Sequence, residues 1–357
     1  MKNYAFPLIA CVLLGAPLVR AESVYTDPVG VVNITIKGNS DTIVAVPLTP
    51  NPDYSGKVTS AASGGANAFN LNVTGTTGWT ANQFANLYYV RMTSGAKNGM
   101  YYTITANTTG QVTVDTAGDN LSTIAANDTF KIFKYWTLAT LFPPASAGTP
   151  ANPLTASAST SPLARQTQIL ITDPNVAGIN NAATASYYFI SASNWYVSGS
   201  NQISNNVILY PDNSLVIRQP ASVASDVVWS SAGSVMLSSL AMPLLTQAVG
   251  PQDNAIALMR PVDVKLSDLG LDSAFTQSSS TSPLARRDQL FVFDNTTSGI
   301  NKSASRAYYR TGGTWRKAGA DSVVADGDVI RAGDAFMIRK FQTGTGASVV
   351  WNNTATY

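Results

Sequence analysis

Four aspartates form the densest acidic group of the chain: Asp321, Asp326, Asp328 and Asp334. Two carboxylates at a suitable separation suffice for glycoside hydrolysis, and carboxylates together with backbone carbonyl oxygens can bind calcium. The spacing does not fit an EF-hand loop, however, and aspartates beside glycines are typical of turns. We therefore interpret the four as turn residues and expect no strong calcium dependence. An irregular calcium site and an Asp-dependent glycoside hydrolase stay open as alternatives.

Aromatic and basic residues are mixed just before this group, in Tyr309, Arg310, Trp315 and Arg316. The intervening Gly312–Gly313 can take the positive φ values of a two-residue hairpin turn, which predicts Arg310 opposite Trp315 and Tyr309 opposite Arg316. Each pair would form a cation–π contact on one face of the hairpin. Arginines on both faces would place the hairpin near an edge, as a surface for a glycan or another partner. The alternative is that the rings are core residues under arginine stems.

Composition excludes many catalytic chemistries, because the chain has no histidine and a single cysteine, Cys11, which lies in the predicted leader. Ser-His-Asp and Cys-His mechanisms, Cys/His zinc sites, and haem or iron–sulfur ligation by His or Cys are therefore excluded for the mature chain. Ser94 and Lys97 match the Ser-x-x-Lys pattern of serine acyl enzymes, but a glycine-containing turn explains them better. We expect a protein that is not an enzyme and needs no cofactor.

Residues 1–21 are predicted to be a secretion signal peptide, with a basic Lys2, an apolar run at 6–19 and a small-residue cleavage site at Ala21. A lipoprotein signal ending at Cys11 is the alternative. Removing 1–21 leaves 20 basic and 20 acidic residues, and no later stretch is apolar enough for a transmembrane helix. We expect export to the periplasm, the outer surface or the medium. A net charge near zero argues against nucleic-acid binding.

Composition and turn residues predict an all-β fold. Glu22 is the only glutamate, and the other acidic residues are aspartates, which favour turns over helix surfaces. Short β-branched and aromatic runs, such as 31–36, 87–92 and 100–105, are bounded by Gly, Asn and Ser, as strands are.

A stretch that occurs twice organises the chain: 159–165 and 280–286 both read Ser-Thr-Ser-Pro-Leu-Ala-Arg, 121 residues apart. The same offset relates further landmarks: Asp173 and Asp294, Gly178–Asn180 and Gly299–Asn301, Tyr187–Tyr188 and Tyr308–Tyr309, and Leu215–Arg218 and Phe336–Arg339. Trp195 pairs with Trp315 at one residue less. So many landmarks at one spacing predict a duplicated structural unit, here tandem β-sandwich or barrel-like modules.

We divide the mature chain into an N-terminal β region, 22–143, a first repeat module with its linker, 144–272, and a second repeat module, 273–357. Stretches rich in Ser and Thr, with Pro and Ala in the first, at 143–161 and 273–282, precede the copies and are expected to be long, exposed linkers.

A third, diverged copy is predicted within the N-terminal β region. The interval from a Tyr-Tyr pair to an Asp-led strand is 28 residues between Tyr102 and Phe130, against 27 in each of the two repeat modules. Coincidence between ordinary β-strand sequences is the alternative.

The run from Leu87 to Pro143 carries a family resemblance, in the segments 89–95, 99–108, 128–132 and 135–143. Together with the secretion leader and the following Asp27-Pro28-Val29-Gly30, these segments resemble an uncharacterised family of secreted proteins that occurs as many paralogues in Verrucomicrobia and related bacteria. The resemblance implies export from a cell of Gram-negative type. It implies no catalytic residues, because no activity is assigned to that family.

Taken together, these features predict a non-catalytic secreted or cell-surface structural or interaction protein built from duplicated β modules. An extracellular glycan-binding protein is the alternative, because the mixture of basic and aromatic residues is densest in the second copy. From Thr281 to Tyr357 there are ten basic residues against six acidic ones. Extracellular polysaccharide or other surface proteins are the expected partners, and the expected surface consists of Tyr309, Arg310, Trp315 and Arg316.

Overall fold

A computed structural model of the protein describes residues 27–73 and 77–355. Almost all of its regular elements are antiparallel strands, so the prediction of an all-β fold is confirmed. The predicted signal peptide, 1–21, lies outside the described residues. In the described part of the chain, no helix combines the length and the apolar character needed to cross a membrane.

The first module is made from two separate stretches of chain. Its strands are β1 (Val29–Ile36), β2 (Ser40–Val44), β10 (Trp136–Thr137), β11 (Gln168–Ile171), β12 (Ala185–Phe189), β13 (Trp195–Val197), β14 (Ile208–Leu209), β15 (Leu215–Gln219) and β16 (Val227–Ser234). Its main sheet has the order β13-β12-β11-β15-β2, while β1 pairs with β16 and β10 with β14. The short helices α1 (Leu138–Leu141), η1 (Pro144–Ser146) and η2 (Pro162–Ala164) lie between β10 and β11.

The second module repeats this order in one continuous stretch. Its strands are β17 (Leu240–Leu244), β18 (Gln252–Ala257), β19 (Val264–Lys265), β20 (Gln289–Val292), β21 (Arg306–Thr311), β22 (Thr314–Lys317), β23 (Ala320–Val324), β24 (Val329–Ile330), β25 (Ala335–Lys340) and β26 (Val349–Asn353), with helical turns η3 (Leu266–Leu269) and η4 (Pro283–Ala285). The main sheet is β23-β22-β21-β20-β25-β18, while β17 pairs with β26 and β19 with β24. Apart from β23, every strand has a counterpart in the first module.

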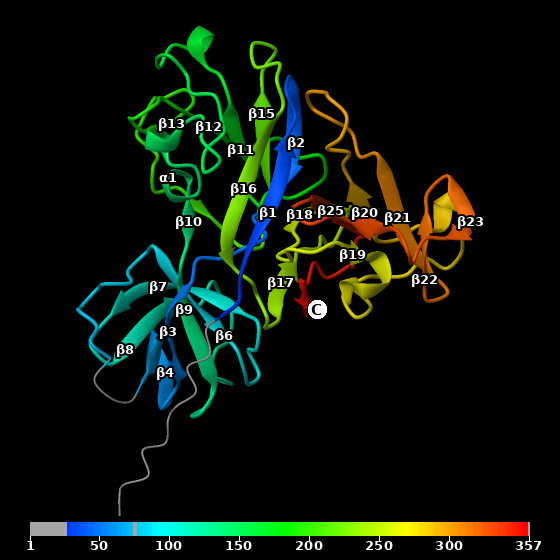
Figure 1. Cartoon of the computed structure of the whole chain (residues 1–357). Coiled ribbons are helices and arrows are strands. Elements are labelled where there is room, and N and C mark those ends of the chain that lie inside the picture. The colour runs from blue at the N-terminus through cyan, green and yellow to red at the C-terminus, as the bar shows by residue number, and fades with distance from the viewer. Residues whose placement is uncertain (1–26, 74–76, 356–357) are drawn as a thin grey trace, which may run out of the picture.

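A further module is inserted between β2 and β10, at the lower left of Figure 1. Its strands are β3 (Pro52–Lys57), β4 (Ser60–Gly65), β5 (Ala68–Asn72), β6 (Tyr88–Met92), β7 (Tyr101–Asn107), β8 (Gln111–Asp115) and β9 (Thr129–Lys134). They form one sheet in the order β3-β9-β6-β7-β8-β5-β4. Five of these strands, β8-β7-β6-β9-β3, follow the order of the other two main sheets. A third, diverged copy in this region stays a prediction.

The sheets do not follow the predicted domain boundaries. Strands β1 and β2, from the expected N-terminal region 22–143, pair with β16 and β15 of the first module. Strands β17 and β18, from the expected first repeat region 144–272, pair with β26 and β25. The reason is that the identical heptapeptides begin only at 159 and 280, whereas the strands that complete each sheet precede them in the chain.

The two stretches expected to be exposed linkers are partly buried. Leu154 belongs to the core of the first module and Phe275 to that of the second, at 1% and 4% exposure. The backbone N–H groups of Ser157 and Ser278 donate to carbonyl oxygens of β12 and β21, each at 2.8 Å. Single apolar residues within a polar stretch thus anchor it, because burying them removes apolar surface from water.

The repeated heptapeptide has the same structural role in both copies. Its arginine, Arg165 or Arg286, lies over the ring of Tyr188 or Tyr309, with the guanidinium carbon 4.9 Å from the ring centre in each case. Each tyrosine hydroxyl also points to a carbonyl oxygen of the heptapeptide. The duplicated motif is therefore explained by packing against the duplicated Tyr-Tyr strand.

An ion pair on the first module binds a loop of the second. Arg218 donates from Nε and Nη2 to the carboxylate of Asp41, at 2.7 and 2.8 Å. The same carboxylate accepts the backbone N–H of Asn301 at 2.7 Å, and the N–H of Asp41 donates to the carbonyl of Gly299 at 2.8 Å. The repeated Gly-Ile-Asn loop of one module thus docks on β2 of the other.

The same contact occurs in the opposite direction. Arg339 donates from Nε and Nη2 to Asp253 at 2.7 and 2.9 Å, and Asp253 accepts the N–H of Asn180 at 2.7 Å. The N–H of Asp253 donates to Gly178 at 2.9 Å. We name these two sets of contacts the reciprocal clamp. It has the form of a two-fold interface, in which each half presents the same surface to the other, and it accounts for the repeated Gly-Ile-Asn and arginine landmarks.

Candidate functional site

The hairpin predicted from Gly312–Gly313 is present with the predicted register. Arg310 lies opposite Trp315 and Tyr309 opposite Arg316, and both glycines have positive φ, at 59° and 79°. The guanidinium of Arg310 lies over Trp315, 5.5 Å from the ring centre, which confirms one of the two expected cation–π contacts. The ring of Tyr309 is covered by Arg286, from the heptapeptide.

The hairpin does not present these residues as a surface. Tyr309 and Trp315 are buried, and Arg310 is only 8% exposed. Strand β22 is not an edge strand either, because β23 pairs with its outer side. Arginines on both faces do not require an exposed hairpin, because protein groups accept their hydrogen bonds. Arg310 forms an ion pair with Asp272, and Arg316 donates to the carbonyl of Ser322 at 2.8 Å.

The four clustered aspartates have separate partners. Asp321 accepts from Arg286 at 2.8 Å and from the Tyr309 hydroxyl at 2.7 Å, and Asp326 accepts the backbone N–H of Trp315 at 2.7 Å. Within the described residues, no three His, Cys, Asp or Glu side chains come together as a metal site would require. Only Asp328 and Asp334 face a common cavity.

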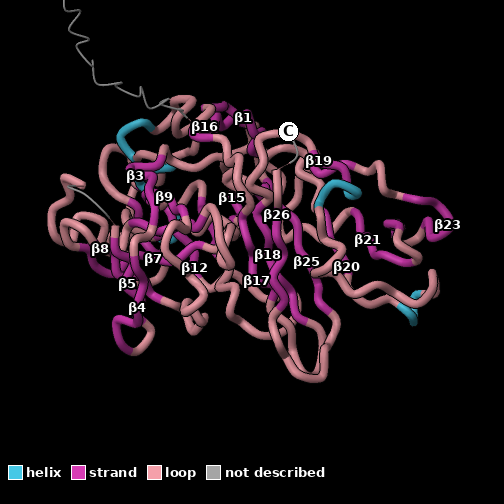
Figure 2. The backbone as a smooth tube through the Cα atoms, turned by 90° about the horizontal axis from the view of Figure 1, so that it is seen from below, coloured by secondary structure: helices cyan, strands magenta, loops and turns pink. Residues whose placement is uncertain are grey.

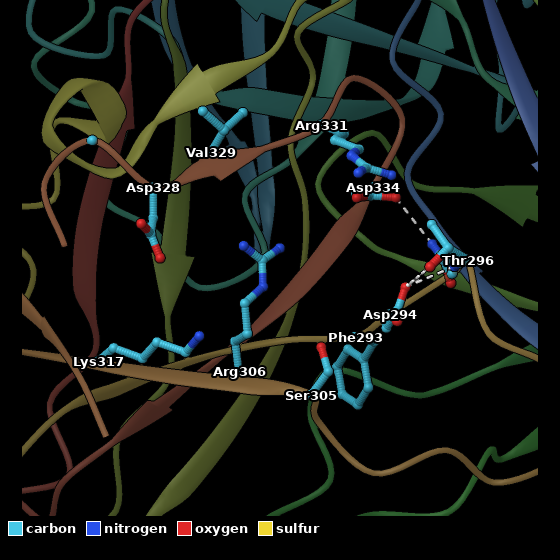
Figure 3. Close-up of a pocket in the computed structure, with 12 residues that line it drawn as sticks. Phe293, Asp294, Thr296, Ser305, Arg306, Lys317, Asp328, Val329, Arg331 and Asp334 are labelled. Atoms are coloured by element: carbon cyan, nitrogen blue, oxygen red, sulfur yellow. Dashed lines mark hydrogen bonds between the residues drawn. The ribbon is translucent and has the colours of Figure 1, made fainter. Parts of the chain in front are cut away.

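This cavity, the charged pocket, is the candidate site of the second module. It has a volume of about 630 Å³, within the range of about 300–1,000 Å³ typical of small-molecule sites. Its lining comes from the end of β20, the beginning of β21, the end of β22 and the segment around β24. The lining residues are Phe293, Asp294, Asn295, Thr296, Ser305, Arg306, Lys317, Gly327, Asp328, Val329, Arg331 and Asp334 (Figure 3).

Strand alternation explains why two of the basic side chains meet. Arg306 and Tyr308 are two positions apart on β21, and Lys317 on β22 lies opposite Tyr308. All three side chains therefore share one face of the sheet. Tyr308 is buried in the core on this face, at 1% exposure, while Arg306 and Lys317 lie beyond it and are half-buried. The sheet thus places two cations at the end of the core.

The basic residues of the charged pocket have few partners in the protein. Arg306 donates from Nη1 to the hydroxyl of Tyr308 at 3.2 Å. Among the residues that the structure describes, the side chains of Lys317 and Arg331 form no hydrogen bond or ion pair. In Figure 3 the ammonium end of Lys317 points toward the side chain of Arg306, and Arg331 lies beside Asp334. Most of the N–H groups of the three cations are free to bind a ligand.

Asp328 and Asp334, in contrast, each accept a hydrogen bond from a neutral donor. The hydroxyl of Tyr308 donates to Asp328 at 2.6 Å, and burial together with this bond raises the pKa of Tyr308 to about 12. Asn295 donates from Nδ2 to Asp334 at 3.0 Å. Burial raises the pKa of Asp334, and the Asn295 bond and the charges of nearby arginines oppose this rise.

Asp294, at the other end of the pocket, is held by its own turn. It accepts from the hydroxyl and the backbone N–H of Thr296, at 2.6 and 2.8 Å, bonds that Figure 3 shows as dashed lines. These bonds hold the pKa of Asp294 below its ordinary value. Each of the three carboxylates therefore has a protein donor that does not depend on the three cations.

The first module has a cavity at the equivalent place, which we name the apolar pocket. Its volume is about 210 Å³. At the repeat offset of 121 residues, its lining has Ala185 for Arg306, Val207 for Asp328, Tyr210 for Arg331 and Asn213 for Asp334. Both linings share one acidic position, which is Asp173 in the first module and Asp294 in the second. The charge of the second pocket is therefore not a requirement of the strand order.

Sequence reasoning missed this site. The excess of basic residues in the second copy predicted a binding surface, but it favoured the hairpin, where arginines and aromatic residues adjoin in sequence. The informative signal was the difference between the copies at the repeat offset, for example Ala185 against Arg306. Only the strand pairing shows that such positions, from four separate segments, line one cavity.

Comparison of the chain with family models, with curated proteins and with solved structures gave no match.

Proposed function

We propose that the protein is an exported, non-catalytic interaction protein that binds its partner through the charged pocket. One observation carries this proposal: an equivalent cavity in the first module is apolar, so the fold does not need the charges of the second. Half-buried cations without protein acceptors are costly, because they lose hydration without gaining hydrogen bonds. A ligand that supplies the acceptors would offset that cost.

The composition and the pocket chemistry support a binding role over a catalytic one. The chain has no histidine, so the commonest general base is absent. The carboxylates of Asp294, Asp328 and Asp334 are each held by a neutral donor. The apolar run at 6–19 and the resemblance to secreted proteins of Verrucomicrobia support export. A glycan-binding protein is the specific form of this proposal that the mixture of donors and acceptors favours.

A glycan array tests the proposal. The mature chain, 22–357, is expected to bind a subset of the array, and Arg306→Met with Lys317→Met is expected to abolish that binding. Lys265→Met is the matched control, because Lys265 is an exposed lysine of the same module outside the pocket. Equal binding by the double variant would exclude the pocket as the site. Release of new reducing ends from a bound glycan would contradict a non-catalytic role.

A glycoside hydrolase is the second candidate, and one observation favours it. A cleft of about 560 Å³ beside the inserted module is lined by both Asp119 and Asp212. Burial raises the pKa of Asp212. Burial acts in the same direction on Asp119, but hydrogen bonds from Lys97 and Tyr102 hold its pKa below the ordinary value. Two carboxylates whose pKa values are shifted in opposite directions are the pattern of an acid and a nucleophile or base.

This second candidate has a direct test. If the cleft is catalytic, Asp212→Asn and Asp119→Asn each abolish the release of reducing ends from a polysaccharide that the wild-type protein degrades. Tyr101 donates to Asp212 at 2.8 Å, so a purely structural role for this carboxyl predicts changed stability and no change in turnover. Absence of turnover by the wild-type protein on a broad polysaccharide panel removes the candidate.

A further inference from the structure

The charged pocket contains equal numbers of formal charges, but its donors and acceptors are not equally engaged. The lining includes three cations, Arg306, Lys317 and Arg331, and three carboxylates, Asp294, Asp328 and Asp334. The carboxylates accept from Thr296, Tyr308 and Asn295, whereas the three cations together make a single hydrogen bond within the described chain, from Arg306 to Tyr308. The unsatisfied groups are therefore mainly cationic donors.

This arrangement limits the class of ligand. A densely charged polyanion would meet three carboxylates together with the cations, and like charges at close range repel. A cationic ligand would be repelled by Arg306, Lys317 and Arg331, none of which forms an ion pair within the described residues. A molecule with one negative group and several hydroxyls meets neither obstacle. Its negative group satisfies the cations, while its hydroxyls, each both donor and acceptor, satisfy the free lone pairs of Asp328 and the N–H groups of Arg331.

The geometry adds a place for the negative group. Arg306 and Lys317 are on one face of neighbouring strands, and in Figure 3 the ammonium end of Lys317 points toward the side chain of Arg306. A guanidinium presents paired N–H groups that match the two oxygens of a carboxylate, and a neighbouring ammonium adds a third donor. The volume of about 630 Å³ leaves space for more than the carboxylate alone.

We propose that the charged pocket binds an acidic sugar residue, whose carboxylate lies between Arg306 and Lys317 and whose hydroxyls bond to Asp328 and Arg331. This inference rests on the proposed function and names the ligand class of the same site. Arg331 is exposed, at the rim of the pocket, so the sugar chain continues outward past it. The apolar pocket of the first module has an alanine in place of Arg306 and is expected to bind no acidic sugar.

Calorimetry with matched probes tests the ligand class on the mature protein. The probes are galacturonic acid and its methyl ester, 3′-sialyllactose and lactose, with acetate and inorganic phosphate as simple anions. At least one acidic probe is expected to bind at least tenfold more tightly than its uncharged counterpart and than either simple anion. Arg306→Met should reduce its affinity to that of the uncharged form, and Arg306→Lys should retain part of it. Asp328→Asn should weaken both forms, and Lys265→Met neither.

The outcomes separate this inference from the proposed function. If charged and uncharged probes bind equally, and both are lost in Arg306→Met with Lys317→Met, the pocket is a binding site but the acidic class is wrong. If acetate or phosphate binds as tightly as the acidic sugars, the site recognises a simple anion and the inference fails. If no probe and no glycan of the array binds, both proposals fail. Thermal unfolding of each variant establishes that a lost signal reflects binding and not misfolding.

Discussion

The two repeat modules place a cavity at the same point of the same strand order, but one cavity is charged and the other apolar. The difference is made by a few side chains, such as Arg306 against Ala185 on strands that pair identically, and Asp328 against Val207 just before β24 and β14. The backbone arrangement and the chemistry of the cavity therefore vary independently in this protein. The sheet decides which positions meet, and individual side chains at those positions decide what they bind.

A second difference lies inside the modules. In the second, Lys340 and Asp288 form an ion pair at 2% and 0% side-chain exposure. At the repeat offset the first module has Gln219 and Thr167. The backbone contact is the same in both: Asp288 accepts the N–H of Thr276 at 2.6 Å, and Thr167 accepts that of the equivalent threonine in the first module, at 3.1 Å. In the first module both positions are neutral: Thr167 keeps the backbone contact, and Gln219 donates to the carbonyl of Ile36 at 3.3 Å.

The largest expected effect on stability comes from replacing Lys340 and Asp288, one at a time, by the residues of the first module. Lys340→Gln alone should destabilise the protein by about 3–5 kcal/mol, because it leaves the buried carboxylate of Asp288 without its cation. Adding Asp288→Thr, as in the first module, should recover most of the loss. Urea unfolding of the two single variants and the double variant measures the coupling. If the double variant loses as much free energy of unfolding as the two single variants together, the two interiors are not interchangeable.

The next largest effect concerns the reciprocal clamp, where the two modules are alike. Arg218→Ala and Arg339→Ala should each cost about 2–3 kcal/mol, because Asp41 and Asp253 are buried, at 5% and 4% side-chain exposure. This is below the range for fully buried pairs, since the arginines are partly exposed. Chemical denaturation of both variants checks the symmetry. A strong loss in one and none in the other would mean that only one of the two docked loops holds the modules together.

A smaller effect is expected at the hairpin turns. Gly313 has a φ of 79° with no atom near its absent Cβ, and its counterpart Ala192 adopts a φ of 53°. Glycine adopts this left-handed region freely, whereas alanine is strained there by about 1 kcal/mol. Gly313→Ala should therefore destabilise, and Ala192→Gly stabilise, by about 1 kcal/mol or less. Differential scanning calorimetry should show melting temperatures that move in opposite directions; a shift in the same direction contradicts the turn argument.

The smallest effect is expected from Asp334→Asn, which copies Asn213 of the first module and keeps the size of the side chain. Because burial raises the pKa of Asp334 above its ordinary 3.8, the folded state holds this proton more tightly than the unfolded state. The stabilisation of the folded state by this carboxyl is therefore fully present at low pH and is lost as pH rises through its folded pKa. The variant should be more stable than the wild type near pH 7, with no gain below about pH 3.8. An equal gain in stability at both pH values would mean that the variant packs better, and that the charge of Asp334 is not the cause.

The sequence by itself determined the all-β class and one local register, and it predicted a repeat. Asparagine, glycine and serine between short β-branched runs predicted strands and turns, and Gly312–Gly313 predicted the hairpin, because these signals act over a few neighbouring residues. The identical heptapeptides, 159–165 and 280–286, predicted equivalent structural units, and the two main sheets share one strand order. No long-range information was needed for any of these inferences.

Tertiary structure alone decided which residues are buried and which form a site. Neighbours in sequence suggested a surface of arginines and aromatic rings at Arg310 and Trp315, but packing against Asp272 and the core covers it. The charged pocket joins Asp294, Arg306, Lys317 and Asp328, which belong to segments that meet only when the strands pair. Local patterns cannot specify such a meeting, because it depends on the closure of long loops and on the burial of a shared core.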